Sequence, residues 1–129
     1  MGATILIVDD EPLVMQIMVM ALRRPGYELI TAESPEEVFR LCARPRTVGL
    51  QIDLAIMDVI MPRMSGPELV DSLRAQGVVP KHILYVSGFP RYFITNHRGL
   101  DPGARFLQKP FTVQKLIGVV DEIMDGDRP

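Results

Sequence analysis

The chain has 129 residues, 47% of them apolar and 23% charged, and its 14 basic and 16 acidic side chains give a formal net charge of −2. This size and composition predict one folded domain over residues 1–129, with an ordered core at 3–124 and a loose tail at 125–129. The nearly balanced charge excludes the strongly basic surface of proteins that bind nucleic acid or anionic membranes directly.

The chain contains one cysteine, Cys42, so a disulfide framework is excluded and a reducing compartment is expected. Cys42 falls at helical spacing from Val38, which favours an ordinary core position. With one cysteine and two distant histidines, a zinc site is not predicted. No signal peptide precedes Thr4, and no apolar run approaches the roughly 20 residues that a membrane-spanning helix needs, so we expect a cytoplasmic protein.

Short apolar runs alternate along the chain with stretches of helical pattern. Pro12 in a first turn and Pro25-Gly26 mark the two ends of the first helix. Ser34 followed by Glu37 has the pattern of a capping box and opens the second helix. In chain order we expect strands at about 4–8, 27–32, 52–57, 82–86 and 105–107, and helices at about 12–24, 34–44, 66–76 and 112–124.

Strands that alternate with helices of ten or more residues indicate right-handed crossovers, and hence a doubly wound α/β domain with a parallel sheet. Three of the five runs are nearly continuous in apolar residues, as strands buried on both faces should be. The weakest part of the pattern is 88–103, where Pro90, Gly99 and several β-branched and aromatic residues predict a short or irregular fourth helix.

Polar residues with chemical capability follow four of the expected strands, namely Asp9-Asp10, Asp58, Ser87 and Lys109. The carboxyl ends of parallel strands meet at one edge of a sheet, so we expect these side chains to converge there. Three carboxylates at such an edge repel each other by roughly 4 kcal/mol per close pair at an effective dielectric near 20. This cost indicates that a cation belongs among them.

This order of residues resembles the receiver domain of two-component response regulators. The likeness to receivers attached to hybrid histidine kinases rests on three stretches, Asp58-Val59-Ile60-Met61-Pro62, Ser87-Gly88-Phe89 and Phe106-Leu107-Gln108-Lys109-Pro110-Phe111. The loop Met61-Pro62-Arg63-Met64-Ser65-Gly66 is similar to the family's M-P-x-M-x-G loop, and the likeness covers essentially the whole chain. The resemblance implies a flavodoxin-like fold with five parallel strands in the order 2-1-3-4-5 and helices on both faces. That strand order is a known property of receivers, and the pattern of apolar runs alone does not determine it.

The resemblance also implies the chemistry. Asp58 would be the nucleophile that takes a phosphoryl group from a phosphohistidine of a histidine kinase or histidine phosphotransfer protein. Lys109 would pair with one phosphoryl oxygen, and Ser87 would donate a hydrogen bond to another. Because this transfer depends mostly on positioning and charge neutralisation, the domain would assist its own phosphorylation and dephosphorylation without being an enzyme for a separate substrate.

A divalent cation, Mg²⁺ or Mn²⁺, is implied at the same edge. Its expected ligands are Asp10, Asp58 and the backbone carbonyl of Ile60, with Asp9 acting through water. Mg²⁺ prefers a few carboxylates, several waters and substrate phosphate, which this group of residues can supply.

Two residues would carry the signal. In the family the bond Lys109-Pro110 is usually cis and aims the lysine into the site, and Phe106 occupies the position of the switch aromatic. On phosphorylation Ser87 would move toward the phosphoryl group and Phe106 would turn inward into the vacated space. Phenylalanine has no hydroxyl, so this signal would travel by packing alone.

The chain departs from many receivers at Ile60 and Phe89, which lie two residues past Asp58 and Ser87. Polar residues at these positions can orient an attacking water, whereas apolar ones shield the acyl phosphate. We therefore expect slow loss of the phosphoryl group.

The first helix is more apolar than its fold requires, which suggests a second, exposed apolar stripe. In the receiver family this helix packs on the histidine-bearing helices of the partner. The helical spacing predicts a core stripe and a docking stripe, with Val14, Ile17, Met18 and Ala21 in the first and Met15, Val19 and Leu22 in the second.

Taken singly, each site residue has an ordinary explanation, as a helix cap, a loop carboxylate, a turn hydroxyl or a solvated lysine. A haloacid dehalogenase-type phosphatase would need D-x-D after the first strand, where this chain has adjacent aspartates. A flavodoxin-like redox domain would need a hydroxyl-rich phosphate loop there. A degenerate receiver that serves only for interaction is the third alternative.

The chain ends with its last helix, so it is either part of a hybrid histidine kinase, which we favour, or a stand-alone response regulator. The segment 91–101 belongs to a surface that receivers often use for dimerisation, and its weak helical pattern favours a monomer.

Overall fold

The computed structural model describes residues 2–43, 51–90 and 103–126. The expected fourth helix therefore lies outside the described residues, and so does 127–129 of the expected loose tail, whereas Asp125 belongs to the last helix. The elements are β1 (Ala3–Val8), α1 (Pro12–Leu22), β2 (Tyr27–Ala32), α2 (Pro35–Cys42), β3 (Leu54–Asp58), α3 (Gly66–Ala75), β4 (His82–Ser87), β5 (Arg105–Gln108) and α5 (Val113–Asp125).

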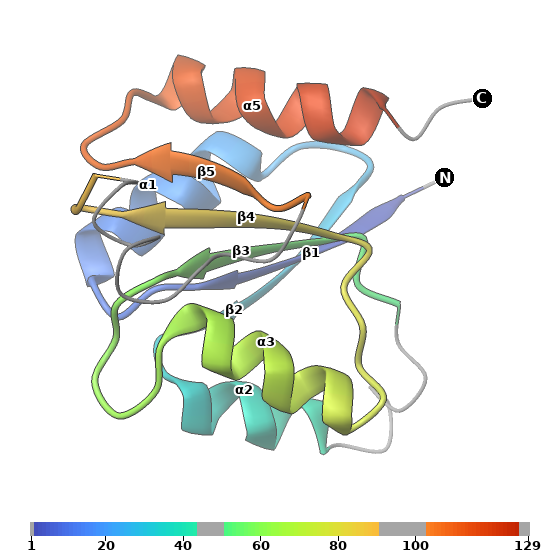
Figure 1. Ribbon diagram of the computed structural model, residues 1–129. Helices are drawn as coiled ribbons and strands as arrows, with labels where there is room; N and C mark the ends of the chain where they lie inside the picture. The colour runs from blue at the N-terminus through green and yellow to red at the C-terminus, as the bar shows by residue number, and fades with distance from the viewer. Residues whose placement is uncertain (1, 44–50, 91–102, 127–129) are drawn as a thin grey trace.

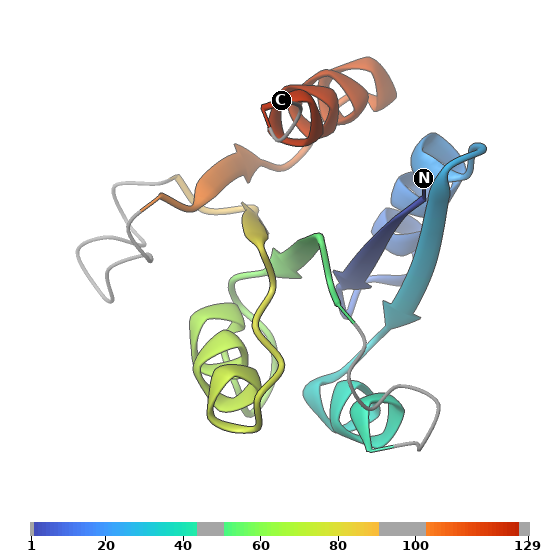
Figure 2. The same cartoon turned by 90° about the vertical axis from the view of Figure 1, so that its right-hand side faces the viewer.

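The five strands form one parallel sheet in the order β2-β1-β3-β4-β5, which confirms the expected fold. Helices α1 and α5 cover one face of the sheet, and α2 and α3 cover the other (Figure 1; Figure 2). The arrowheads of β3, β4 and β5 point to the same edge in Figure 1. The carboxyl ends of the strands, where ligands bind in sheets of this kind, are thus gathered on one side of the molecule.

Hydroxyl side chains begin three of the four described helices. Ser34 Oγ accepts a hydrogen bond from the backbone N–H of Glu37, but the Glu37 carboxylate accepts from Glu33 N–H, so only half of the expected capping box forms. The complete box lies at α3, between Ser65 and Glu68. Thr112 caps α5 as expected. These caps satisfy backbone donors that the first helical turn leaves free.

Alternation along the three central strands divides the core into two layers. Ile5, Ile7, Leu54, Ile56, Leu84 and Val86 face α1 and α5, whereas Leu6, Val8, Ala55, Met57, Ile83 and Tyr85 face α2 and α3. All of these side chains are buried because both faces of the sheet are covered. The third strand begins two residues later than expected and includes Asp58, so the acidic residue ends the strand itself.

The predicted division of α1 into faces is only partly confirmed. Met18 and Ala21 are buried in the core and Val14 packs against it, as expected, but the other assignments are wrong. Met15 and Leu22, expected in the docking stripe, are buried in the core, and Val19 packs partly against it. Ile17, expected in the core, is 41% exposed. The apolar side chains that do face solvent are Leu13, Ile17 and Met20, which we call the α1 stripe. Although α1 is apolar, none of the helices described here is long and apolar enough to cross a membrane.

Gly66, the first residue of α3, lies directly against the backbone of Asp58 at the end of β3. A Cβ at this position would lie 2.4 Å from the backbone oxygen of Asp58, and Gly66 N–H donates a hydrogen bond of 2.8 Å to Val59 O. No side chain larger than hydrogen fits without moving backbone.

We predict that Gly66→Ala lowers the free energy of unfolding by about 1–3 kcal/mol, because the methyl group overpacks a backbone contact. The matched control is Gly118→Ala, an exposed position inside α5 where a Cβ meets nothing within 4 Å. That change should raise stability by up to about 1 kcal/mol through helix propensity. Urea denaturation measures both, and equal stabilities of the two variants would contradict the predicted contact.

Candidate functional site

The register of the sheet brings the two buried aspartates together. Val8 of β1 pairs with Met57 of β3, so continuing the ladder by one residue sets Asp9 opposite Asp58. Both residues also follow the alternation toward the α1 and α5 face, since they lie two positions after Ile7 and Ile56. The side chains of Asp9 and Asp58 are buried. Two carboxylates are therefore held together at the sheet edge by strand geometry.

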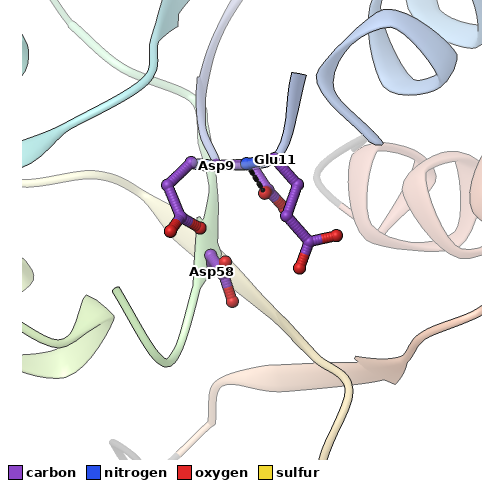
Figure 3. A group of neighbouring side chains, drawn as sticks. Asp9, Glu11 and Asp58 are labelled. Carbon is purple, nitrogen blue, oxygen red and sulfur yellow. Dashed lines mark hydrogen bonds between the residues drawn. The ribbon is translucent and has the colours of Figure 1, made fainter. Parts of the chain in front are cut away.

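Two further acids from the β1–α1 connection complete a cluster of four. Ligand oxygens of Asp9, Asp10, Glu11 and Asp58 all lie within 4.8 Å of one another. Figure 3 shows the carboxylates of Asp9, Glu11 and Asp58 gathered at this point, with the hydrogen bond of 2.9 Å that Glu11 N–H donates to Asp9 Oδ1. Sequence reasoning missed Glu11, although its place directly after Asp10 and before α1 could have indicated it.

Lys109, directly after β5, supplies positive charge to this cluster. Its Nζ lies 2.9 Å from Asp9 Oδ2, 3.4 Å from Asp58 Oδ2 and 3.5 Å from Glu11 Oε1. The Lys109 side chain is only 10% exposed. The bond Lys109-Pro110 is cis, as the family resemblance implied.

The donor set fits a divalent cation. Asp9 Oδ2 is buried, and it accepts no hydrogen bond from any group in the described part of the chain because the nearby Lys109 ammonium is not aligned with it. The Lys109 ammonium offsets part of the charge of this oxygen, but a lone pair without an aligned donor leaves the oxygen able to bind a cation. Three further carboxylates stand within reach, and oxygen ligands of this kind are those that Mg²⁺ selects.

Burial and mutual repulsion make Asp9 and Asp58 hard to ionise. Desolvation, reinforced by the charge of Asp9, raises the pKa of Asp58 from 3.8 to about 7. Burial also raises the pKa of Asp9, although Lys109 opposes that shift. For Lys109, burial favours the neutral amine, but Asp9 and Asp58 outweigh it and the pKa of the ammonium is raised. The lysine therefore stays charged.

Ser87 ends the neighbouring strand at the same edge. Asp58 pairs with Val86 in the ladder, so Ser87 lies one residue beyond that partner and is buried. Its Oγ accepts a hydrogen bond of 3.0 Å from Phe89 N–H, and its carbonyl accepts one of 2.7 Å from Lys109 N–H. The hydroxyl can still donate its own proton. Two of the residues expected in the site are thus joined through the backbone.

The connection from β3 to α3 is held rigidly beside the cluster. Met61 is buried against the α2 and α3 layer, and the capping box at Ser65 fixes the start of α3. Arg63 has a φ of 74°, a left-handed conformation that residues with side chains seldom adopt, and its guanidinium pairs with Glu36 at 3.2 Å. The side chain of Ile60, in the same connection, is 44% exposed, as is that of Phe89.

The described chain thus brings together Asp9, Asp10, Asp58 and Lys109, and it places Ser87 at the same edge. Phe106 lies on β5 and packs partly buried against the layer that α2 and α3 cover. The role expected for the Ile60 carbonyl depends on a bound cation, and the switch roles of Ser87 and Phe106 depend on a phosphorylated state, so all three stay predictions.

Comparison with known proteins decides the family. The model of the response regulator receiver domain matches residues 5–121. This chain is a response regulator receiver domain. Receiver domains are signalling modules of two-component systems and generally bind Mg²⁺, which agrees with the fit of the acidic cluster to a divalent cation.

Among curated relatives, the receiver is 33% identical over 96% of its length to the sensor kinase CckA of Brucella abortus, of which it covers 13%. It is 30% identical over 99% of its length to the DNA-binding transcriptional regulator NtrC of Azospirillum brasilense, of which it covers 25%. The chain thus spans a quarter or less of these two relatives.

Solved structures support the fold. The chemotaxis protein CheY4 of Vibrio cholerae superposes with a TM-score of 0.78 at 26% identity, with 95% of this receiver and 99% of CheY4 covered. The receiver domain of the Francisella response regulator 1452 superposes with a TM-score of 0.75 at 22% identity, with 98% and 100% covered.

The raised pKa of Asp58 gives a prediction for stability in metal-free buffer. Between pH 4 and 7 the unfolded chain loses this proton before the folded receiver does, so folding is penalised increasingly as pH rises and uniformly above about 7. Asp58→Asn removes the penalty and leaves Lys109 paired with Asp9 and Glu11. Its unfolding free energy should exceed that of the wild type by about 1–3 kcal/mol at pH 8 and by less at pH 5.

Denaturant unfolding at the two pH values checks this, with Glu28→Gln on the exposed start of β2 as the control for loss of a distant carboxylate. Added Mg²⁺ should reduce the difference in unfolding free energy between the wild type and Asp58→Asn. A gap that is constant from pH 5 to 8 would show that burial of Asp58 does not raise its pKa.

Proposed function

We propose that this receiver accepts a phosphoryl group on Asp58 from a phosphohistidine of a histidine kinase or histidine phosphotransfer protein. The observation that carries the proposal is the buried Asp58 carboxylate, which lies 3.4 Å from a charged lysine and within a four-carboxylate cluster. A carboxylate so placed can act as a nucleophile toward phosphorus while the surrounding charges offset those of the phosphoryl oxygens.

In the transfer, an Asp58 oxygen attacks the phosphorus and the phosphorus–nitrogen bond to the histidine breaks. The bonding pair returns to the imidazole nitrogen of the partner, and an acyl phosphate remains on Asp58. Lys109 turns its ammonium to a phosphoryl oxygen, and Ser87 donates its hydroxyl proton to another. Asp10, Asp58 and the Ile60 carbonyl, with Asp9 through water, would hold Mg²⁺ or Mn²⁺, whose positive charge would offset that of the phosphoryl oxygens.

Phosphorylation of Asp58 would also change the surface at β5. Ser87 now accepts a hydrogen bond from Phe89 N–H, and turning toward a phosphoryl oxygen would vacate space near β5. Phe106 is partly buried on β5 and pairs in register with Tyr85, two residues before Ser87. Its inward rotation would couple the chemistry to the β5 surface by packing. This is a two-state change driven by a new local charge.

The partner would dock on the α1 stripe, which replaces the docking face expected from the sequence. Leu13 and Met20 are 73% and 76% exposed. Beside them lies a groove of about 430 Å³, with Val14 and Ile17 on α1 and Pro110 and Phe111 beyond β5. Glu11 and Lys109 of the acidic cluster also line this groove. An apolar surface that reaches the acceptor suits a helix carrying the phosphohistidine.

The larger context also belongs to the proposal. The similarity to the sensor kinase CckA over 96% of the chain supports a receiver within a hybrid histidine kinase, with a stand-alone response regulator as the alternative. In either case we propose a cytoplasmic domain and favour a monomer.

The proposal is tested by incubation with acetyl phosphate and Mg²⁺, followed by mass spectrometry of the intact protein. We expect the mass gain of one phosphoryl group in the wild type and in Asp53→Asn, a control at the opposite end of β3 whose oxygen can still accept from Thr4 N–H. Asp58→Asn should show no gain. A phosphoryl group on the Asp58→Asn variant would refute the assignment of the acceptor.

A second prediction concerns the lifetime of the phosphoryl group. Ile60 and Phe89 are each 44% exposed and present no polar atom that could orient an attacking water. Replacing them together, as Ile60→Asn with Phe89→Glu, should speed hydrolysis of the acyl phosphate several-fold. The decay of the phosphorylated species after removal of acetyl phosphate measures the rate, and an unchanged rate would sink the shielding hypothesis.

A third prediction concerns docking. Leu13→Glu with Met20→Glu should weaken phosphoryl transfer from the cognate donor about tenfold or more, since charged side chains replace two apolar contacts. Phosphorylation by acetyl phosphate should be unchanged, because neither side chain lies in the site. Val79→Glu, at an apolar residue 61% exposed in the connection from α3 to β4, is the control. Equal loss with both phosphoryl donors, or loss with Val79→Glu, would contradict docking on the α1 stripe.

A further inference from the structure

Lys109 faces three carboxylates, and only two of them have a role in the proposed function. Asp58 accepts the phosphoryl group and binds the cation, and Asp9 binds the cation through water. Glu11 has neither role, yet its Oε1 lies 3.5 Å from Lys109 Nζ. The position of Glu11 is also fixed relative to the site, because its backbone N–H donates to Asp9 Oδ1 at 2.9 Å.

The ammonium and a divalent cation compete for the same oxygens. Lys109 Nζ lies 2.9 Å from Asp9 Oδ2, the buried oxygen that accepts no hydrogen bond in the described chain, and 3.4 Å from Asp58 Oδ2. A cation held at this cluster would bring a second positive centre close to the ammonium in a poorly solvated place. Like charges at such short distance repel strongly, so the ammonium must move away from the shared oxygens.

Glu11 offers the ammonium a place to move to. Its carboxylate is 59% exposed, whereas that of Asp9 is fully buried. Glu11 is the N-cap residue of α1, but its side chain makes no capping hydrogen bond. The carboxylate is therefore not needed to hold the start of the helix. A small rotation of the lysine side chain would bring Nζ closer to Glu11 and farther from Asp9.

We propose that Glu11 is a positioning residue that takes over the Lys109 ammonium when a divalent cation enters the cluster. Lys109 thus leaves the oxygens that the cation needs but stays beside Asp58, ready for the phosphoryl group. This inference deepens the proposed function and rests on it. It predicts that Glu11 favours Mg²⁺ binding through Lys109, beyond the general attraction of any nearby negative charge.

The test is a double-mutant cycle on Mg²⁺ affinity, measured by isothermal titration calorimetry on the wild type, Glu11→Gln, Lys109→Ala and the double variant. With Lys109 present, Glu11→Gln should weaken Mg²⁺ binding about five- to tenfold, since the ammonium keeps competing for Asp9 and Asp58. In the Lys109→Ala background the same change should matter less than about twofold, because no ammonium remains to be moved.

Glu33→Gln is the charge control. Glu33 lines a hollow together with Asp10, and no ion pair joins it to Lys109 among the residues described. Its effect should be the same in both backgrounds. An equal weakening by Glu11→Gln with and without Lys109, or no weakening at all, would overturn the inference. Glu11→Gln is isosteric at an exposed position, and thermal unfolding verifies that the variant is folded.

The same samples separate this inference from the proposed function. A wild type that takes no phosphoryl group from acetyl phosphate overturns the proposed function. A wild type that binds Mg²⁺ and is phosphorylated on Asp58, while Glu11→Gln binds Mg²⁺ equally well, overturns only the role of Glu11.

Discussion

The ion pair that joins Lys109 to the buried carboxylates of Asp9 and Asp58 is the interaction on which the site depends. The strand ladder sets the two aspartates opposite each other, and burial denies them the water that would screen their repulsion. The lysine can reduce this cost only because its own backbone is tied to β4 by the hydrogen bond to the Ser87 carbonyl. The strand register therefore sets the position of the two aspartates, and the hydrogen bond to β4 sets the position of the lysine that offsets their charge.

The parallel sheet also decides which face each site residue serves. Asp9 and Asp58 continue the alternation of residues that face α1 and α5, whereas Ser87 follows Ile83 and Tyr85, which face α2 and α3. Phe106 packs on the latter layer. The acceptor and its lysine thus lie toward the face where the α1 stripe is exposed, and the proposed switch lies toward the other. The surface proposed to receive the phosphoryl group and the surface proposed to respond to it thus lie on opposite faces of the sheet.

Much of this arrangement could be predicted from the sequence because parallel strands bring their ends together whatever their order. Apolar runs gave β1, β2 and β4 nearly to the residue, and the polar residues at the ends of β1, β3, β4 and β5 form the site. The buried and exposed faces of α1 could not be fully predicted, since Gln16 is the only polar residue among its 11. With apolar residues all round the helix, the spacing does not show which side is buried. Gln16 itself marks the exposed side, with Leu13 and Met20 three residues before and four after it. Glu11 was missed because its contact with Lys109 joins residues that are distant in the chain.

The composition of α1 has a consequence for synthesis of the protein. Until β1 pairs with β3 and α5 covers the same face, the side of α1 that belongs in the core stays uncovered. A nascent chain that has made only its first strands and helices therefore presents an almost entirely apolar helix with no partner. The helix is complete by Leu22, whereas the last helix that covers its layer begins at Val113. The core side of α1 is therefore covered only after almost the whole domain has been made.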